Sequence, residues 1–102
     1  MRYNSVLDLH THTVASGHAY CSLREMAKVA SEKGLEVLGI TEHAPSMPGT
    51  CHKFYFNNLK VVPREMYGIQ LLLGSEVNIL DAQGTVDLGQ HTLSSMDVVI
   101  AS

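Results

Sequence analysis

The chain has 102 residues, of which 45% are hydrophobic and 17% charged, a balance typical of a single soluble globular domain. Its net charge is −3 and it has no basic run, which argues against a nucleic-acid surface. The apolar runs are too short to span a bilayer and the N-terminus lacks a signal-peptide pattern, so we expect a cytoplasmic protein outside the membrane. Cys21 and Cys51 are expected to be free thiols, and a zinc-ligand role for Cys51 is the less favoured alternative.

The first expected element is a short, buried parallel strand over residues 6–9, an apolar run interrupted only by Asp8. His10 and His12 follow it, and side chains two positions apart in an extended segment point to the same face. A lone histidine is more often a surface or core residue than a ligand. Two neutral imidazoles on one face at a strand end, with His18 in the next loop, favour a divalent cation. Asp8 is placed to fix the tautomer of one ring.

A helix is expected over residues 22–33, because Ser22 and Glu25 form a capping box and Gly34 stands at the C-terminal end. A second apolar run over 35–40 predicts another strand. A right-handed crossover through the helix would make the two strands parallel.

The second strand ends in the segment Thr41-Glu42-His43. Because parallel strands end at the same edge of a sheet, we expect His10, His12 and His43 to gather there. This convergence is the main physical argument for a metal centre.

The remaining elements are expected in a fixed order. Residues 44–56 form a loop packed down by Phe54 and Tyr55, and a helix runs from 57 or 58 to 67, with Pro63 in a kink and Gly68 closing it. A third strand covers 69–79, residues 85–88 form part of a small hairpin, His91 is exposed, and a fourth strand begins at 96.

Glu76 lies near the end of the third predicted strand, in an apolar setting where an unpaired charge is costly. It is either a paired or protonated carboxylate or a metal ligand. The ligand role is favoured because it also explains the position of the charge.

The motifs D-L-H-T-H-T, I-T-E-H and G-S-E-V-N, in this order, resemble those of the PHP (polymerase and histidinol phosphatase) family of metal-dependent phosphoesterases, above all its YcdX-type phosphatases. The resemblance implies an α/β fold, the N-terminal half of a distorted seven-stranded β/α (TIM-like) barrel. Residues 1–102 would be the N-terminal part of a single PHP domain that is truncated here. The implied activity is phosphomonoester hydrolysis by metal-activated water at a trinuclear site. Zn or Mn, with Fe as an alternative, would occupy it with up to three ions.

The resemblance also implies roles for individual residues. The implied metal ligands are His10, His12, His18, His43 and Glu76. His52 and Arg64 correspond to positions near a small phosphorylated substrate. Glu42 stands where the family commonly has Asp, just outside the ligand set, so its longer side chain alters that geometry. No catalytic side chain is assigned beyond the metal-bound water, and with further ligands expected after Ser102 we expect these 102 residues alone to lack turnover.

Three alternatives stay open from the residues. One is a phosphodiesterase or nuclease of the same family, which the acidic balance disfavours. A second is an amidohydrolase-like metallohydrolase, which would need a lysine or carboxylated lysine bridge on a later strand, whereas here Glu76 would supply the bridge. The third is a metal-storing or regulatory module without hydrolysis. We also expect that an open strand edge at 98–101 favours a homo-oligomer.

Overall fold

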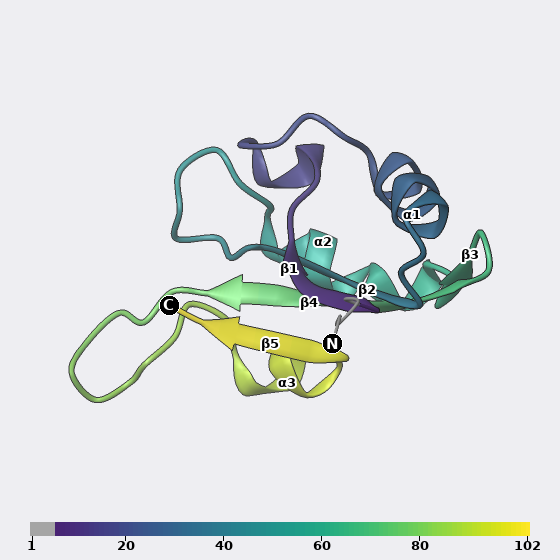
Figure 1. Cartoon of the computed structure of the whole chain (residues 1–102). Coiled ribbons are helices and arrows are strands. Elements are labelled where there is room, and N and C mark those ends of the chain that lie inside the picture. Colours follow the sequence, from purple (N-terminus) through teal and green to yellow (C-terminus); the bar gives the residue numbers. More distant parts are fainter. Residues whose placement is uncertain (1–5) are drawn as a thin grey trace, which may run out of the picture.

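A computed structural model describes residues 6–102 as a five-stranded sheet whose parallel strands follow the order β1–β2–β4–β5 (Figure 1). These strands are β1 (Leu7–Thr11), β2 (Val37–His43), β4 (Ile69–Val77) and β5 (Val98–Ala101). The short β3 (Glu65–Met66) pairs antiparallel with the start of β4. The connections contain the helices α1 (Leu23–Glu32), α2 (Lys53–Asn57) and α3 (Gln90–Ser94) and the 3-10 turns η1 (Val14–Ser16) and η2 (Leu59–Val61).

The predicted fold class is confirmed. Parallel strands joined through helices form an open, curled α/β half-barrel, with α1 on the connection between β1 and β2 (Figure 1). All four parallel strands therefore bring their C-terminal ends to one edge.

Helix α1 confirms its prediction almost to the residue. The Ser22 side chain accepts from the amide of Glu25 at 3.2 Å, and the Glu25 carboxylate accepts from the amide of Ser22 at 2.9 Å. Ala27 and Ala30 are its buried face, and Gly34 has φ +84°, a left-handed conformation that glycine adopts without strain.

The core lies along β2 and β4, whose side chains are shielded by neighbouring strands on both sides. Its most buried aliphatic members are Leu38, Ile40, Leu71, Leu73 and Val77. The first strand was expected to be buried, and this was wrong: Leu7 is 50% exposed. The physical reason is its position, because β1 is at the edge of the sheet and pairs only with β2 among residues 6–102.

The helix predicted from 57 or 58 to 67 was also wrong. Helix α2 ends at Asn57, η2 ends at Val61, and the chain then turns extended before Pro63, which has no amide hydrogen to continue a helix. Tyr67 and Gly68, with φ of 54° and 77°, form a tight turn between β3 and β4.

Three smaller expectations have mixed outcomes. Phe54 is 70% exposed, so the loop after β2 is packed down by Phe56 instead, with Tyr55 beside it. The hairpin at 85–88 is reduced to a single bridge between Ile79 and Val86. His91 is exposed, as predicted, and no helix among residues 6–102 is long and apolar enough to cross a membrane.

Candidate metal centre

The first strand carries a bulge just before the predicted site. Asp8 pairs with Leu38 and Thr11 with Ile40, so β1 contains one residue more than β2 over this stretch. The amide of His10, inside the bulge, donates to the Asp8 carboxylate at 3.1 Å. Asp8 was expected to hold an imidazole ring, whereas its recorded hydrogen bond among residues 6–102 is to the backbone. Bulges re-aim side chains, and here His10 is the residue that is re-aimed.

His10, His12 and Glu76 converge at the C-terminal ends of β1 and β4. Nε2 of His10 lies 2.6 Å and Nε2 of His12 lies 3.1 Å from the same Glu76 oxygen, Oε1. The potential ligand atoms of the three residues all lie within 4.8 Å of one another. The structure thus brings together side chains that are more than sixty positions apart in the sequence, as the strand order predicts.

His43 joins this group from β2, where it is the register partner of Glu76. Its ring stacks on that of His12, with centroids 4.2 Å apart and planes at 4°. Its Nδ1 is buried, lies 3.7 Å from Glu76 Oε1 and has no hydrogen-bond partner in the described part of the chain. A buried ring nitrogen without a partner beside a carboxylate fits a cation ligand.

The electrostatics of the group also suit a cation. Burial lowers the pKa of His12, and the neighbouring His43 ring lowers it further, so His12 is neutral and its lone pair is free near pH 7. Burial alone would raise the pKa of Glu76, but the hydrogen bond from His10 and the adjacent histidines lower it overall. Imidazoles around an ionised carboxylate are a donor set suited to Zn, Mn or Fe.

His18 lies at the rim of this group. It is exposed, and its ring meets that of His43 edge-on with centroids 5.7 Å apart. The structure therefore places all five predicted ligands in one neighbourhood, His18 being the outermost.

Glu42 is fully buried directly behind the histidines. Its carboxylate accepts from the amide and hydroxyl of Thr13, from Ser16 Oγ at 2.8 Å and from the Tyr55 hydroxyl at 3.4 Å. Its Oε1 is 3.9 Å from Nδ1 of His12. The longer side chain at this position is thus accommodated by a ring of donors, and it sits outside the ligand set.

Sequence reasoning missed Thr13 and Ser16, which are both buried and polar. Thr13 is the N-cap of η1, and its side chain accepts from the amide of Ala15 at 3.2 Å. A polar residue that caps a turn between two histidines was the available signal.

The two predicted substrate-side residues both make hydrogen bonds within the chain. Nδ1 of His52 accepts from the amide of Phe54 at 3.1 Å, so this side chain caps α2. Arg64 donates from Nε to Asp97 at 2.7 Å, and its carbonyl accepts from the amide of Leu71. Leu71 and Glu76 both lie on β4, about 16 Å apart along the extended strand. A substrate contact by His52 or Arg64 stays a prediction.

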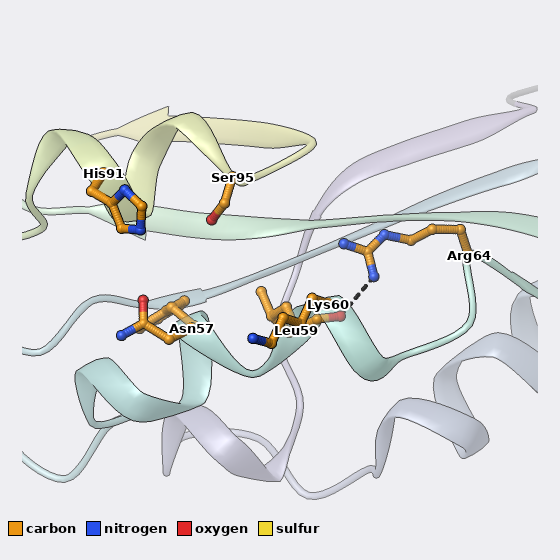
Figure 2. Close-up of a pocket in the computed structure, with 7 residues that line it drawn as sticks. Asn57, Leu59, Lys60, Arg64, His91 and Ser95 are labelled. Carbon is orange, nitrogen blue, oxygen red and sulfur yellow. Dashed lines mark hydrogen bonds between the residues drawn. The ribbon is translucent and has the colours of Figure 1, made fainter.

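Arg64 instead lines a pocket of about 370 Å³ between the α2–η2 segment and α3 (Figure 2). His91 of α3 and Ser95, which directly follows α3, lie across it from Asn57 and Lys60. None of the predicted metal ligands lines this pocket, so it is separate from the histidine centre.

Cys51 is buried beneath η1, where its thiol donates to the carbonyl of Ala15 at 3.3 Å. Burial, followed by the nearby Glu42 charge, raises its pKa to about 11. Cys51 is a free thiol, as predicted. Cys21 is free and exposed.

Comparison with known proteins identifies similar chains. The model of the PHP domain matches residues 8–100. A probable phosphatase of Clostridium novyi is 57% identical over the whole chain, which covers 41% of that protein. A probable phosphatase of Thermoanaerobacter sp. is 50% identical over 95% of the chain, and one of Caldanaerobacter subterraneus is 49% identical over all of it. The chain spans about two fifths of the length of these relatives.

Proposed function

The chain belongs to the PHP family, and from this premise we propose that it forms part of a metal-dependent phosphatase that hydrolyses phosphomonoesters. The observation that supports the metal is the convergence of His10, His12 and Glu76, with the unpartnered Nδ1 of His43 beside them. We expect His18 to complete the set, for up to three Zn, Mn or Fe ions in a complete domain.

The residues of the chain prepare the centre for this chemistry. Divalent cations, when bound, supply positive charge for phosphate oxygens and acidify a water molecule. Glu76 contributes the negative charge that brings cations to the strand ends, and the neutral His12 ring contributes a lone pair. The His10 side chain is 52% exposed, so this side of the centre is open to a small substrate.

Two supporting features concern the partners. The net charge of −3 disfavours a nucleic acid and leaves a small phosphorylated compound as the proposed substrate. The contacts of His10 and His12 with Glu76 favour this acid as the bridge, whereas an amidohydrolase-like centre would require a lysine bridge from a later strand.

The test uses this chain and a version extended to the length of its relatives. Both are analysed for bound metal and assayed with p-nitrophenyl phosphate, bis-p-nitrophenyl phosphate and single-stranded DNA, with Mn²⁺ or Zn²⁺ added. We expect the extended protein to hydrolyse the monoester and this chain to bind metal without turnover. Preferential cleavage of the diester or DNA would favour the nuclease alternative, and metal binding without any hydrolysis by the extended protein would favour a storage module.

A matched pair of variants locates the activity. Glu76→Gln in the extended protein is expected to reduce turnover at least 100-fold, because the shared acid is lost. Glu36→Gln changes an exposed carboxylate at the opposite end of β2 and is expected to have no effect. Equal activity of the two variants would contradict the proposed centre.

A further inference from the structure

We propose that the pocket between the α2–η2 segment and α3 binds the phosphate group of a small organic compound, at a site separate from the histidine centre. None of the candidate metal ligands lines this pocket, so its occupant would be a second molecule and not the substrate of that centre. The inference does not depend on the proposed function, because every group that it uses is present without a metal.

The lining of the pocket carries positive charge in a chain whose net charge is −3. Two of the seven Lys and Arg residues, Lys60 and Arg64, line it, and no Asp or Glu among residues 6–102 does so. His91 and Asn57 add further nitrogen atoms that can donate hydrogen bonds. Exposed lysines are ordinarily only solvated, and Lys60 differs because these other donors border the same space (Figure 2).

The guanidinium group of Arg64, at one end of the pocket, is held in place by three acceptors (Figure 2). Its Nε donates to Asp97 at 2.7 Å, and its Nη1 donates to the carbonyls of Leu59 and Val62 at 2.7 and 2.9 Å. Nη2 has no partner in the described part of the chain and is free to donate to a ligand. Asp97 offsets the charge of Arg64, but its carboxylate also accepts from the Leu73 amide at 3.0 Å and does not line the pocket. The cation is thus oriented before a ligand arrives.

Asn57, at the end of α2, is fixed by a contact with α3. Its Oδ1 accepts from the hydroxyl of Thr92 at 3.0 Å, and Thr92 is buried. Because this bond occupies the oxygen, the Nδ2 group is the part of the side chain that can donate to a ligand. The Ser95 hydroxyl donates to the carbonyl of Thr92 at 2.7 Å, so Ser95 shapes the pocket without supplying a donor.

These donors fit a phosphate better than a carboxylate. Lys60 of η2 supplies a point charge, Arg64 before β3 a planar cation, and His91 of α3 a ring N–H. A tetrahedral phosphate offers oxygens to donors on several sides and carries up to two negative charges, whereas a planar carboxylate offers two oxygens and one charge. The buried part of the lining is apolar, with Phe56 and Leu59, so we expect an apolar group beside the phosphate.

The test is calorimetric titration with phenyl phosphate of this chain and of the version extended to the length of its relatives. Both are kept in EDTA, so that phosphate held by a metal does not contribute. We expect saturable binding with a dissociation constant of about 1 mM or below. Inorganic phosphate, which lacks the apolar group, and benzoate, which lacks the phosphate, are each expected to bind about 5-fold or more weakly.

Two variants of the lining locate the binding. Lys60 is exposed, so Lys60→Gln is expected to fold normally and to weaken the binding of phenyl phosphate about 5-fold or more. Asn57→Asp keeps an oxygen for Thr92 but places a negative charge in the pocket, and is expected to abolish binding. Lys28→Gln is the matched control, because it removes the same charge from an exposed position of α1 that does not line the pocket. It is expected to bind like the wild-type chain.

Absence of phenyl phosphate binding, or benzoate binding as tight as that of phenyl phosphate, would overturn the inference. Binding that Lys60→Gln and Asn57→Asp leave unchanged, or that Lys28→Gln weakens equally, would overturn it too, since the anion would then lie elsewhere. Phenyl phosphate that binds in EDTA as expected but is not hydrolysed by the extended protein with Mn²⁺ or Zn²⁺ would count against the proposed function alone.

Discussion

The carboxylate of Asp8 satisfies the amide that the β1 bulge leaves unpaired, and His10 is the residue that this bulge presents to Glu76. Removing the acceptor in Asp8→Ala frees that amide and relaxes the bulge, so we expect divalent-cation affinity to fall about 5-fold, equivalent to about 1 kcal/mol. Calorimetric titration with Mn²⁺ measures this. Asp8→Asn retains an acceptor oxygen and serves as control, and equal losses in both variants would mean that charge, not the bulge, is responsible.

The two cysteines are expected to differ in reactivity. Cys21 is exposed, whereas Cys51 is buried and its pKa is raised to about 11, so little thiolate is present at pH 8. Iodoacetamide is therefore expected to alkylate Cys21 at least 10-fold faster, as followed by peptide mass spectrometry. Both should react equally in denaturant, and rapid modification of Cys51 in the folded chain would show that the region beneath η1 opens readily.

Among individual residues, the candidate ligands were the predictable part of the site. His10, His12 and Glu76 each lie at a strand end, and their meeting follows from parallel topology alone. Ser16 was not predictable, because its importance depends on contacts with Glu42 and His43, which are 26 and 27 positions away. Arg64 illustrates the converse: the sequence shows a cation, whereas the fold pairs it with Asp97.

At the level of elements, Asp87 joins the loop after β4 to the loop after β2. Its carboxylate accepts from the amide and side chain of Asn78, both at 2.8 Å, and from the amide of Ser46 at 2.9 Å. Partial burial alone would raise the pKa of Asp87, but these hydrogen bonds lower it to about 2. These hydrogen bonds of Asp87 therefore stabilise the folded state as long as its carboxylate is ionised.

The pH dependence follows from that pKa. Asp87 is ionised in both states above an unfolded pKa near 3.8, and its contribution is lost as the pH falls from there towards 2. We expect Asp87→Ala to cost about 1 kcal/mol at pH 6, since solvent screens part of the interaction. Urea unfolding of the wild-type chain and of Asp87→Ala between pH 6 and 2.5 should show their difference in unfolding free energy shrinking below pH 4. A difference in unfolding free energy that does not depend on pH would contradict stabilisation by the ionised Asp87 carboxylate.

Elements with strong periodicity and clear caps were predictable, as the capping box of α1 shows. The segment 57–67 was not, because Pro63 was compatible with a kink, and only the pairing of β3 with β4 decides for an extended strand. That pairing depends on the turn at Tyr67 and Gly68. Tyr67 takes a positive φ there, which a tyrosine in the sequence does not predict.

For the whole molecule, the candidate centre connects three strands, so an ion bound there is expected to stabilise the entire sheet. At a Mn²⁺ concentration 100 times the dissociation constant, linkage gives about 2.7 kcal/mol, or a rise in Tm of roughly 10 °C. Calorimetric scans with and without Mn²⁺ measure this rise. Glu76→Gln should abolish it and Glu36→Gln should retain it, and an equal rise in both would indicate binding elsewhere.

The open edge of β5 raises the matter of association. Val99 is 41% exposed, and β5 pairs only with β4 within residues 6–102. Association through residues 98–101 stays a prediction, with dimers expected at high protein concentration. Light scattering after size exclusion checks it, and a single monomeric species at every concentration would dismiss it.

The distance along the chain between His10 and Glu76, 66 positions, has a consequence for how the ion is chosen. During synthesis His10 and His12 emerge long before Glu76, and β2 must pair between β1 and β4 before these side chains can meet. Until then, a passing cation meets only two imidazoles on a loose segment. For the proposed centre, selection among competing metals would thus wait until the sheet has formed, and the finished geometry, not the order of encounter, would decide which ion is retained.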